Sequence, residues 1–251
     1  MNNSELYNYT LRLADNALIL GQRLSELCSK GPFLEEDLAQ TNIALDYIGR
    51  AQSLYNYAAQ LSGKPLSEDE LAYRRAENNY YNVLLVEQPD EDFAHTIVRQ
   101  FFYSVADCLF YAELTKSKNE TLASIAKKVI KESKYHLNHS SDWVKRLGDG
   151  TELSHEKMQN AVNALWMYTD ELFEIDDIEH KLIKEGVAVN SSNHKSLWLA
   201  EVTEVFKEAG LSVPENNFMM TGGRSGNHSE HFGHLLSELQ YLQRAYPDAT
   251  W

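Results

Sequence analysis

Apolar residues recur along most of the chain with the three-to-four-residue spacing of amphipathic helices, and glycines and prolines interrupt this spacing at a few points. The pattern predicts four long helices, each ended by a turn signal. They cover residues 4–29, 34–61, 91–116 and 120–147. A short helix is expected after Ser67, because Ser67 and Glu70 form a capping box.

Beyond residue 147 the helical spacing returns in shorter pieces. Residues 152–251 predict three or four further helices and one long irregular segment at 211–227. Four long helices followed by short ones favour an all-α fold, an up-and-down four-helix bundle with additional C-terminal helices. We expect a single domain over 1–251, with a core bundle at about 4–147 and an elaboration at about 152–251.

Composition excludes several classes of partner. Hydrophobic residues make up 43% of the 251 residues, and the formal net charge is -14. Such an acidic chain does not suit nucleic acid or an anionic membrane surface, since both need many Lys and Arg contacts. No apolar run approaches a membrane span of about 18 residues, and the N-terminus does not resemble a signal peptide. A soluble, cytoplasmic protein is expected.

The stretch KESKYHLNHS, residues 131–140, is the first candidate site. Four-helix iron proteins use Glu-x-x-His on two helices and one further carboxylate from each of the others. On a helical wheel Ser133 and His136 lie on the apolar stripe, whereas Glu132 lies at its flank. An inward Glu-x-x-His would need glutamate at 133. We therefore interpret His136 as a hydrogen-bonded core histidine, with Ser133 as one available partner, and His139 as solvated.

Two aspartates on other long helices are also candidates. Asp15 and Asp107 sit among apolar residues, where an inward carboxylate needs a partner. Either they form a buried cluster with His136 at the position of a former metal site, or they face the surface. The spacing leaves both alternatives open.

The stretch TGGRSGNHSEHFGH is the second candidate site. His228, His231 and His234 are three residues apart, so a helix beginning near Ser229 would present two of them together. Zinc sites normally take three or four ligands, with Cys, Asp or Glu among them. The alternative to a metal site is a histidine-rich helix start on a surface that meets a partner or substrate.

The glycine-rich turn ahead of these histidines carries Arg224. Backbone N–H groups and one arginine in such a turn can hold a phosphate. The turn is not a P-loop, because the GKS/T ending and the preceding strand are missing. A loop that simply needs unusual backbone angles is the favoured interpretation.

Five stretches, taken together in this order, carry a resemblance to a known family. They are TLRLADNALILGQRL (10–24), LEEDLAQTNIALDYIGRAQ (34–52), NVLLVEQPDEDFAHTIVRQFF (82–102), IKESKYHLNHSSDWVKRLGDG (130–150) and TGGRSGNHSEHFGHLLSELQYLQRAYP (221–247). They resemble the C subunits of bacterial phenylacetyl-CoA epoxidases, also called phenylacetic acid degradation protein C. The resemblance implies a ferritin-like bundle, related to the catalytic, iron-carrying A subunit of the same complex.

The resemblance also implies site residues. Placing the A-type Glu-x-x-His pattern on this chain puts Asn42 and Leu45 at one half-site, and Ser133 and His136 at the other. Asp107 falls near the carboxylate position of the third helix, and Asp15 is the nearest acidic candidate on the first. These residues lack most of the anions that hold two irons, so the chain is expected to hold no metal or other cofactor, with the diiron centre in the A subunit.

The function implied is that of a non-catalytic structural subunit of the monooxygenase that epoxidises the ring of phenylacetyl-CoA, pairing with the A subunit. Arg224, His228 and His231 would contact CoA or the subunit interface. The alternative is a metal-binding ferritin-like protein or oxygenase with its own site at the C-terminal histidines. For the chain alone, the sequence is compatible with a monomer and with a homodimer, since two-fold dimers are common.

Overall fold

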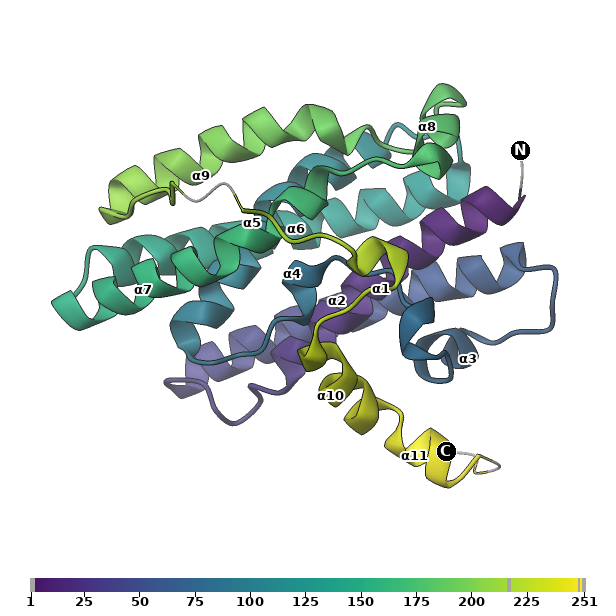
Figure 1. The fold of residues 1–251 in the computed structure, drawn as a ribbon, viewed down its shortest axis with the longest axis horizontal. Helices are drawn as coiled ribbons and strands as arrows, with labels where there is room; N and C mark the ends of the chain where they lie inside the picture. Colours follow the sequence, from purple (N-terminus) through teal and green to yellow (C-terminus); the bar gives the residue numbers. More distant parts are fainter. Residues whose placement is uncertain (1–2, 216–217, 248, 250–251) are drawn as a thin grey trace.

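The computed structural model describes residues 3–215, 218–247 and 249, and within them it contains helices and turns but no β-strand. The all-α class is confirmed. The four long helices are α1 (Asn3–Ser25), α2 (Leu34–Leu61), α5 (Phe93–Leu114) and α6 (Glu120–Gly148) (Figure 1). The bounds of α2 and α6 agree with the prediction to within one residue. α1 and α5 are shorter than predicted, because turns take over at their ends.

The long helices form two antiparallel pairs, α1 with α2 and α5 with α6. The connection between the pairs, residues 62–92, holds α3 (Glu68–Tyr73), η1 (Glu77–Asn79) and α4 (Leu84–Glu87). At one end of the bundle Trp143 of α6 contacts Phe33 before α2 and Phe93 of α5, with ring centroids 5.8 and 5.2 Å apart. α2 and α5 therefore start at the same end. The up-and-down order holds within each pair, and the connection returns along the bundle between them.

The start of α3 is fixed by the capping box that the sequence predicts. The backbone N–H of Glu70 donates to the Ser67 hydroxyl at 3.2 Å, and the N–H of Ser67 donates to the Glu70 carboxylate at 2.8 Å. Each side chain thus satisfies a terminal N–H group of a six-residue helix that is too short to be stable by itself.

The remaining elements cover the bundle and the connection. They are α7 (Glu152–Leu165), η2 (Trp166–Tyr168), η3 (Asp170–Phe173), α8 (Asp177–Lys184), η4 (Ser191–His194), α9 (Lys195–Ala209), η5 (Gly223–Ser225), α10 (Glu230–Leu239) and α11 (Tyr241–Ala245). One hydrophobic cluster continues from the bundle into them. Where α9 packs on α5, the indole N–H of Trp198 donates to the Phe102 carbonyl at 2.9 Å.

Residues 218–247, called here the C-terminal arm, lie across the connection and α1 (Figure 1). Gly222 and Gly226 adopt φ angles of 135° and 80°, which side chains disfavour, and a Cβ on Gly226 would collide with the Asn78 carbonyl. This fits the interpretation of a loop with unusual backbone angles. Part of the predicted irregular segment, residues 216–217, lies outside the described residues.

None of the helices that the described residues form is long and apolar enough to span a bilayer.

Candidate functional site

The middle of the bundle is occupied by Arg50, which the inner face of α2 directs between α5 and α6. Its guanidinium donates to both carboxylate oxygens of Asp107 at 2.9 Å and to the Ser133 hydroxyl at 3.2 Å. The Ser133 hydroxyl in turn donates to Asp107. The Arg50 and Asp107 side chains are 0% and 2% exposed. Three helices are thus joined by one buried, fully charged pair.

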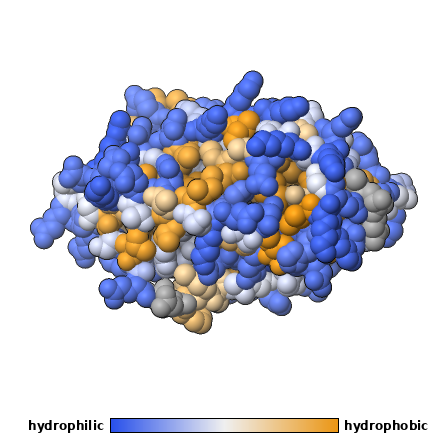
Figure 2. All heavy atoms as spheres, turned by 90° about the horizontal axis from the view of Figure 1, so that it is seen from above, coloured by the Kyte–Doolittle hydropathy of each residue, from blue (hydrophilic) through white to orange (hydrophobic). Residues whose placement is uncertain are grey.

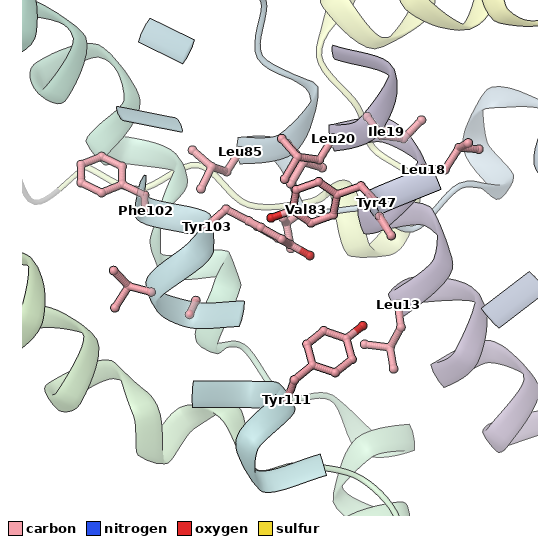
Figure 3. Close-up of a cluster of buried hydrophobic side chains, with 14 of the residues drawn as sticks. Leu13, Leu18, Ile19, Leu20, Tyr47, Val83, Leu85, Phe102, Tyr103 and Tyr111 are labelled. Carbon is pink, nitrogen blue, oxygen red and sulfur yellow. The ribbon is translucent and has the colours of Figure 1, made fainter. Parts of the chain in front are cut away.

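Aromatic rings enclose this pair. The Arg50 guanidinium carbon lies 4.6 Å from the ring centre of Tyr47 and 4.8 Å from that of Tyr111, a cation–π arrangement. Figure 3 shows Tyr47 and Tyr103 pointing toward one another from facing helices, with Tyr111 reaching toward Leu13 of α1. Burial, which favours the neutral base, is outweighed by the Asp107 carboxylate, so the pKa of Arg50 is raised and the guanidinium stays charged.

His136 is fully buried beside this pair, as the helical wheel predicts. Its Nε2 lies 3.0 Å from a carboxylate oxygen of Asp46, and its ring lies against Tyr47 at 4.9 Å. The partner is Asp46 and not Ser133, whose hydroxyl is taken by Asp107. Burial lowers the pKa of His136, the hydrogen bond to Asp46 raises it, and the Arg50 charge lowers it again, so that the imidazole is held neutral. Arg50, Asp107, Ser133, His136 and Asp46 are called here the central cluster.

The structure places the other predicted half-site on the outside of α2. Asn42 is exposed and Leu45 is 59% exposed, so neither lines the interior and this expectation is wrong. Tyr47 and Arg50 are the residues three apart on the inner face of α2 that lie beside His136 and Asp107. His139, expected to be solvated, is instead largely buried and lies 3.0 Å from the Glu36 carboxylate.

Asp15 is buried but lies in a different cluster from Asp107. Its carboxylate accepts from the Tyr55 hydroxyl at 2.5 Å and from the Tyr81 backbone N–H at 2.8 Å, and it pairs with the Arg75 guanidinium. Both aspartates are therefore buried, and each has its own arginine, but they do not share His136. Asp15 fastens α1 to the connection.

The donor set of the central cluster does not fit a pair of iron ions. Bridged irons need several inward carboxylates, whereas Asp107 is the carboxylate fully inside the cluster and a guanidinium already neutralises it. His136 contributes one imidazole. Among the described residues, no group of three or more His, Cys, Asp and Glu side chains is arranged to hold a metal ion.

The C-terminal histidines do not converge on one site. The His228 side chain is 0% exposed, with Nδ1 2.8 Å from the Glu87 carboxylate and Nε2 2.9 Å from the Tyr80 carbonyl. Both neighbours are acceptors, so both ring nitrogens carry hydrogens and neither is free for a metal. His231 is partly buried and His234 is exposed.

The charge on His228 has a clear physical origin. Burial lowers its pKa, but the hydrogen bond and charge of Glu87 and the hydrogen bond to the Tyr80 carbonyl together raise it above the ordinary value. The same Glu87 carboxylate accepts from the Ser229 backbone N–H at 2.7 Å and from Asn82 at 2.9 Å. Glu87, His228, Tyr80, Ser229 and Asn82 are called here the arm anchor.

The glycine-rich turn does bind an anion, but the anion belongs to the chain itself. The backbone N–H groups of Gly222 and Arg224 both donate to one Glu171 oxygen at 3.0 Å, and that of Leu84 donates to the other at 2.7 Å. The Arg224 guanidinium pairs with Glu179 at 2.5 Å. The expected role of Arg224 in holding a phosphate of CoA therefore has no support, since internal carboxylates occupy both sets of donors.

Comparison with known proteins places this architecture in a family. The sequence model of the family described as phenylacetic acid catabolic protein matches residues 1–251. The chain belongs to this family. It is also similar to the C subunit of the 1,2-phenylacetyl-CoA epoxidase of Escherichia coli (strain K12), with 47% identity over 248 residues. The alignment covers 99% of this chain and 100% of that protein, so bundle and C-terminal arm are both included.

Sequence reasoning missed the residue at the middle of the central cluster. Arg50 stands three residues after Tyr47, but α2 carries apolar residues on both sides, so no local signal marked Arg50 as inward. No local signal pointed to Glu87, which lies 141 positions from His228. Glu171 likewise lies far from the turn that binds it.

Proposed function

We propose that this chain is the non-catalytic structural subunit of a cytoplasmic, multicomponent diiron monooxygenase that epoxidises the aromatic ring of phenylacetyl-CoA during phenylacetate degradation. It pairs with the catalytic A subunit, which carries the diiron centre. The name of the similar Escherichia coli protein supports the substrate and the membership of a complex. The central cluster supports the non-catalytic role.

The observation that carries this proposal is the Arg50 guanidinium bound to both oxygens of Asp107. A dinuclear iron site activates oxygen through cations that bridging carboxylates hold in place. Here an organic cation, fixed by the covalent chain, neutralises Asp107 and joins α2 to α5 and α6. The bundle therefore keeps its shape without a metal, and its contribution to a complex is a folded surface.

Co-expression with the A subunit tests the proposal. The two chains should copurify as a stable complex, and epoxidation of phenylacetyl-CoA with an electron donor should require the A subunit. Metal analysis of this chain alone, purified without a histidine tag, should give far less than one iron per chain. Epoxidation by the isolated chain, or stoichiometric iron in it, would contradict the proposal.

A variant of this chain separates a structural from a catalytic contribution. His136→Gln keeps a hydrogen-bonding side chain beside Asp46 but removes the imidazole. The complex that contains it should retain wild-type turnover when compared at equal amounts of assembled complex. A large loss of turnover in a fully assembled complex would show that this chain takes part in the chemistry.

A further inference from the structure

The outward side of α2 carries an unusual surface for an exposed helix. Residues on one side of it, called here the α2 outer face, include three leucines that are 69%, 53% and 59% exposed, in chain order. By the 3.6-residue period, the face consists of Leu34, Leu38, Asn42, Leu45, Gly49, Gln52 and Asn56. None of these residues is charged. From residue 38 to residue 61 the charged residues are Asp46 and Arg50. Arg50 is paired with Asp107 inside the chain, and the Asp46 side chain, 39% exposed, is hydrogen-bonded to His136 at the edge of the face.

The outer side of α9 provides an internal comparison. Its Leu197 and Leu199 are also exposed, by 56% and 41%. Exposed charged residues surround them, namely Lys195, Glu201, Glu204, Lys207 and Glu208. Figure 2, a view from the side on which α9 lies in Figure 1, shows hydrophilic side chains interrupting the hydrophobic ones. Charged residues are depleted in the buried part of an interface. The α2 outer face has this depletion, and the outer side of α9 does not.

Gly49 in the middle of the α2 outer face indicates what kind of element binds there. Glycine weakens a helix interior relative to alanine, so it needs a reason. Gly21 of α1 has one, because a Cβ there would come within 3.1 Å of Ile48 and 3.2 Å of the Ala44 carbonyl. A Cβ on Gly49 would meet nothing within 4 Å. No described residue therefore explains why glycine stands at position 49. A helix of another chain that crosses α2 closely at this point would explain it.

The order of residues along the face disfavours one pairing with a second copy, the antiparallel one in which the two Leu45 residues meet. The face runs about 33 Å, at 1.5 Å per residue, from leucines at one end to amides at the other. In an antiparallel self-pair centred on Leu45, Leu34 would meet Asn56 and Leu38 would meet Gln52. Each buried amide would then face an apolar side chain without a hydrogen-bond partner, which is costly.

We infer that the α2 outer face is the docking surface for a helix of a different subunit, apolar opposite Leu34, Leu38 and Leu45 and hydrogen-bonding opposite Gln52 and Asn56. Resting on the proposed function, that subunit is the catalytic A subunit. Gly49 marks the point of closest approach between the two helices.

Binding of four versions of this chain to the purified A subunit tests the inference, with the wild type as reference. Leu45→Glu places a charge in the middle of the face, and Gly49→Leu fills the point of closest approach. Each should weaken binding at least tenfold. The matched control is Leu197→Glu on α9, a leucine of similar exposure, which should change the affinity less than twofold.

Thermal unfolding of each chain alone shows whether a loss of binding comes from a loss of folding. Leu45→Glu should leave the melting midpoint within a few degrees of wild type, because the side chain is exposed. Gly49→Leu should raise the midpoint, since leucine favours the helix, while it weakens binding. A purely structural role for Gly49 would not give these opposite signs.

Each contrary outcome has a distinct meaning. If the wild-type chain binds the A subunit and both α2 variants bind equally well, the inference is wrong and the proposed function stands. If the wild type does not bind the A subunit, the proposed partnership fails, and this choice of occupant fails with it. If sedimentation shows a wild-type dimer that Leu45→Glu dissociates while A-subunit binding is unchanged, a second copy occupies the face and the inference is overturned.

Discussion

Two histidines in this molecule have equally buried side chains but different charge states, one neutral and one positive. The side chains of His136 in the central cluster and His228 in the arm anchor are both 0% exposed. His136 has one carboxylate on one ring nitrogen, no hydrogen-bond partner among the described residues on the other, and the Arg50 cation nearby. His228 has an acceptor on each nitrogen. Burial favours the neutral form at both sites, and the surrounding charges and acceptors decide the result.

The difference shows how each region is stabilised. In the central cluster the cation is arginine, which stays charged at any ordinary pH, so the bundle is joined by a permanent ion pair. In the arm anchor the cation is a histidine, whose charge depends on pH near neutrality. The cation of the central cluster should therefore stay charged in alkaline solution, whereas the hold on the C-terminal arm should weaken there.

The largest expected effect comes from removing the permanent cation. Arg50→Met leaves Asp107 buried without a counter-charge and should lower the free energy of unfolding by about 3–5 kcal/mol, measured by urea denaturation. The double variant Arg50→Met/Asp107→Leu removes both charges and should recover most of the loss. A single variant as stable as wild type would show that Asp107 is neutral in the fold.

The arm anchor should respond less strongly, because it has further hydrogen bonds. Glu87→Gln removes the anion beside His228 and should cost about 2 kcal/mol, the range for a charged hydrogen bond. It should also lower the pKa of His228, observable by NMR titration, and speed hydrogen exchange at the amide of Ser229. Glu230→Gln, an exposed acidic residue of the same arm, is the control and should change neither.

The pH dependence of stability should separate the two histidines. The pKa of His228 is raised above 6.5, so its contribution is complete below about pH 6.5 and is lost as pH rises through the folded-state pKa. The pKa of His136 is lowered, so its contribution is present above pH 6.5 and is lost as pH falls. Each slope is limited to about 1.4 kcal/mol per pH unit for one proton.

Substitution assigns the two slopes. In unfolding titrations from pH 5 to 9, His228→Gln should flatten the alkaline decline and leave the acid side unchanged. His136→Gln should flatten the acid decline that belongs to that residue. An alkaline decline that persists in His228→Gln would mean that a different group controls the hold on the arm.

The smallest effect is expected at Ser67, an uncharged capping residue outside both histidine sites. Ser67→Ala removes the side-chain half of the capping box and should cost about 1 kcal/mol, equally at pH 6 and pH 9. Ser67→Thr, which keeps a capping hydroxyl, should be close to wild type. A marked pH dependence of the Ser67→Ala effect would show that the connection and the arm anchor are coupled.

Sequence reasoning predicted the elements better than it predicted the site. Ser133 and His136 lie inward because the α6 stripe is apolar on one side only. α2 has leucines on its outer face as well as apolar residues on its inner face, so its periodicity does not say which side is buried. For this reason the pattern of α2 does not show that Asn42 and Leu45 face outward. It also does not show that Arg50 faces inward.

The amino-acid sequence by itself determined the helices, the capping box at Ser67 and the inward direction of His136, because spacing, breakers and caps act between neighbours in the chain. Only the tertiary structure decided that Arg50 pairs with Asp107, that Glu171 is the anion in the glycine-rich turn, and that His228 is charged. The partners in these three contacts lie 57, 53 and 141 positions apart along the chain. The charge of a buried group is set by whatever the fold brings beside it.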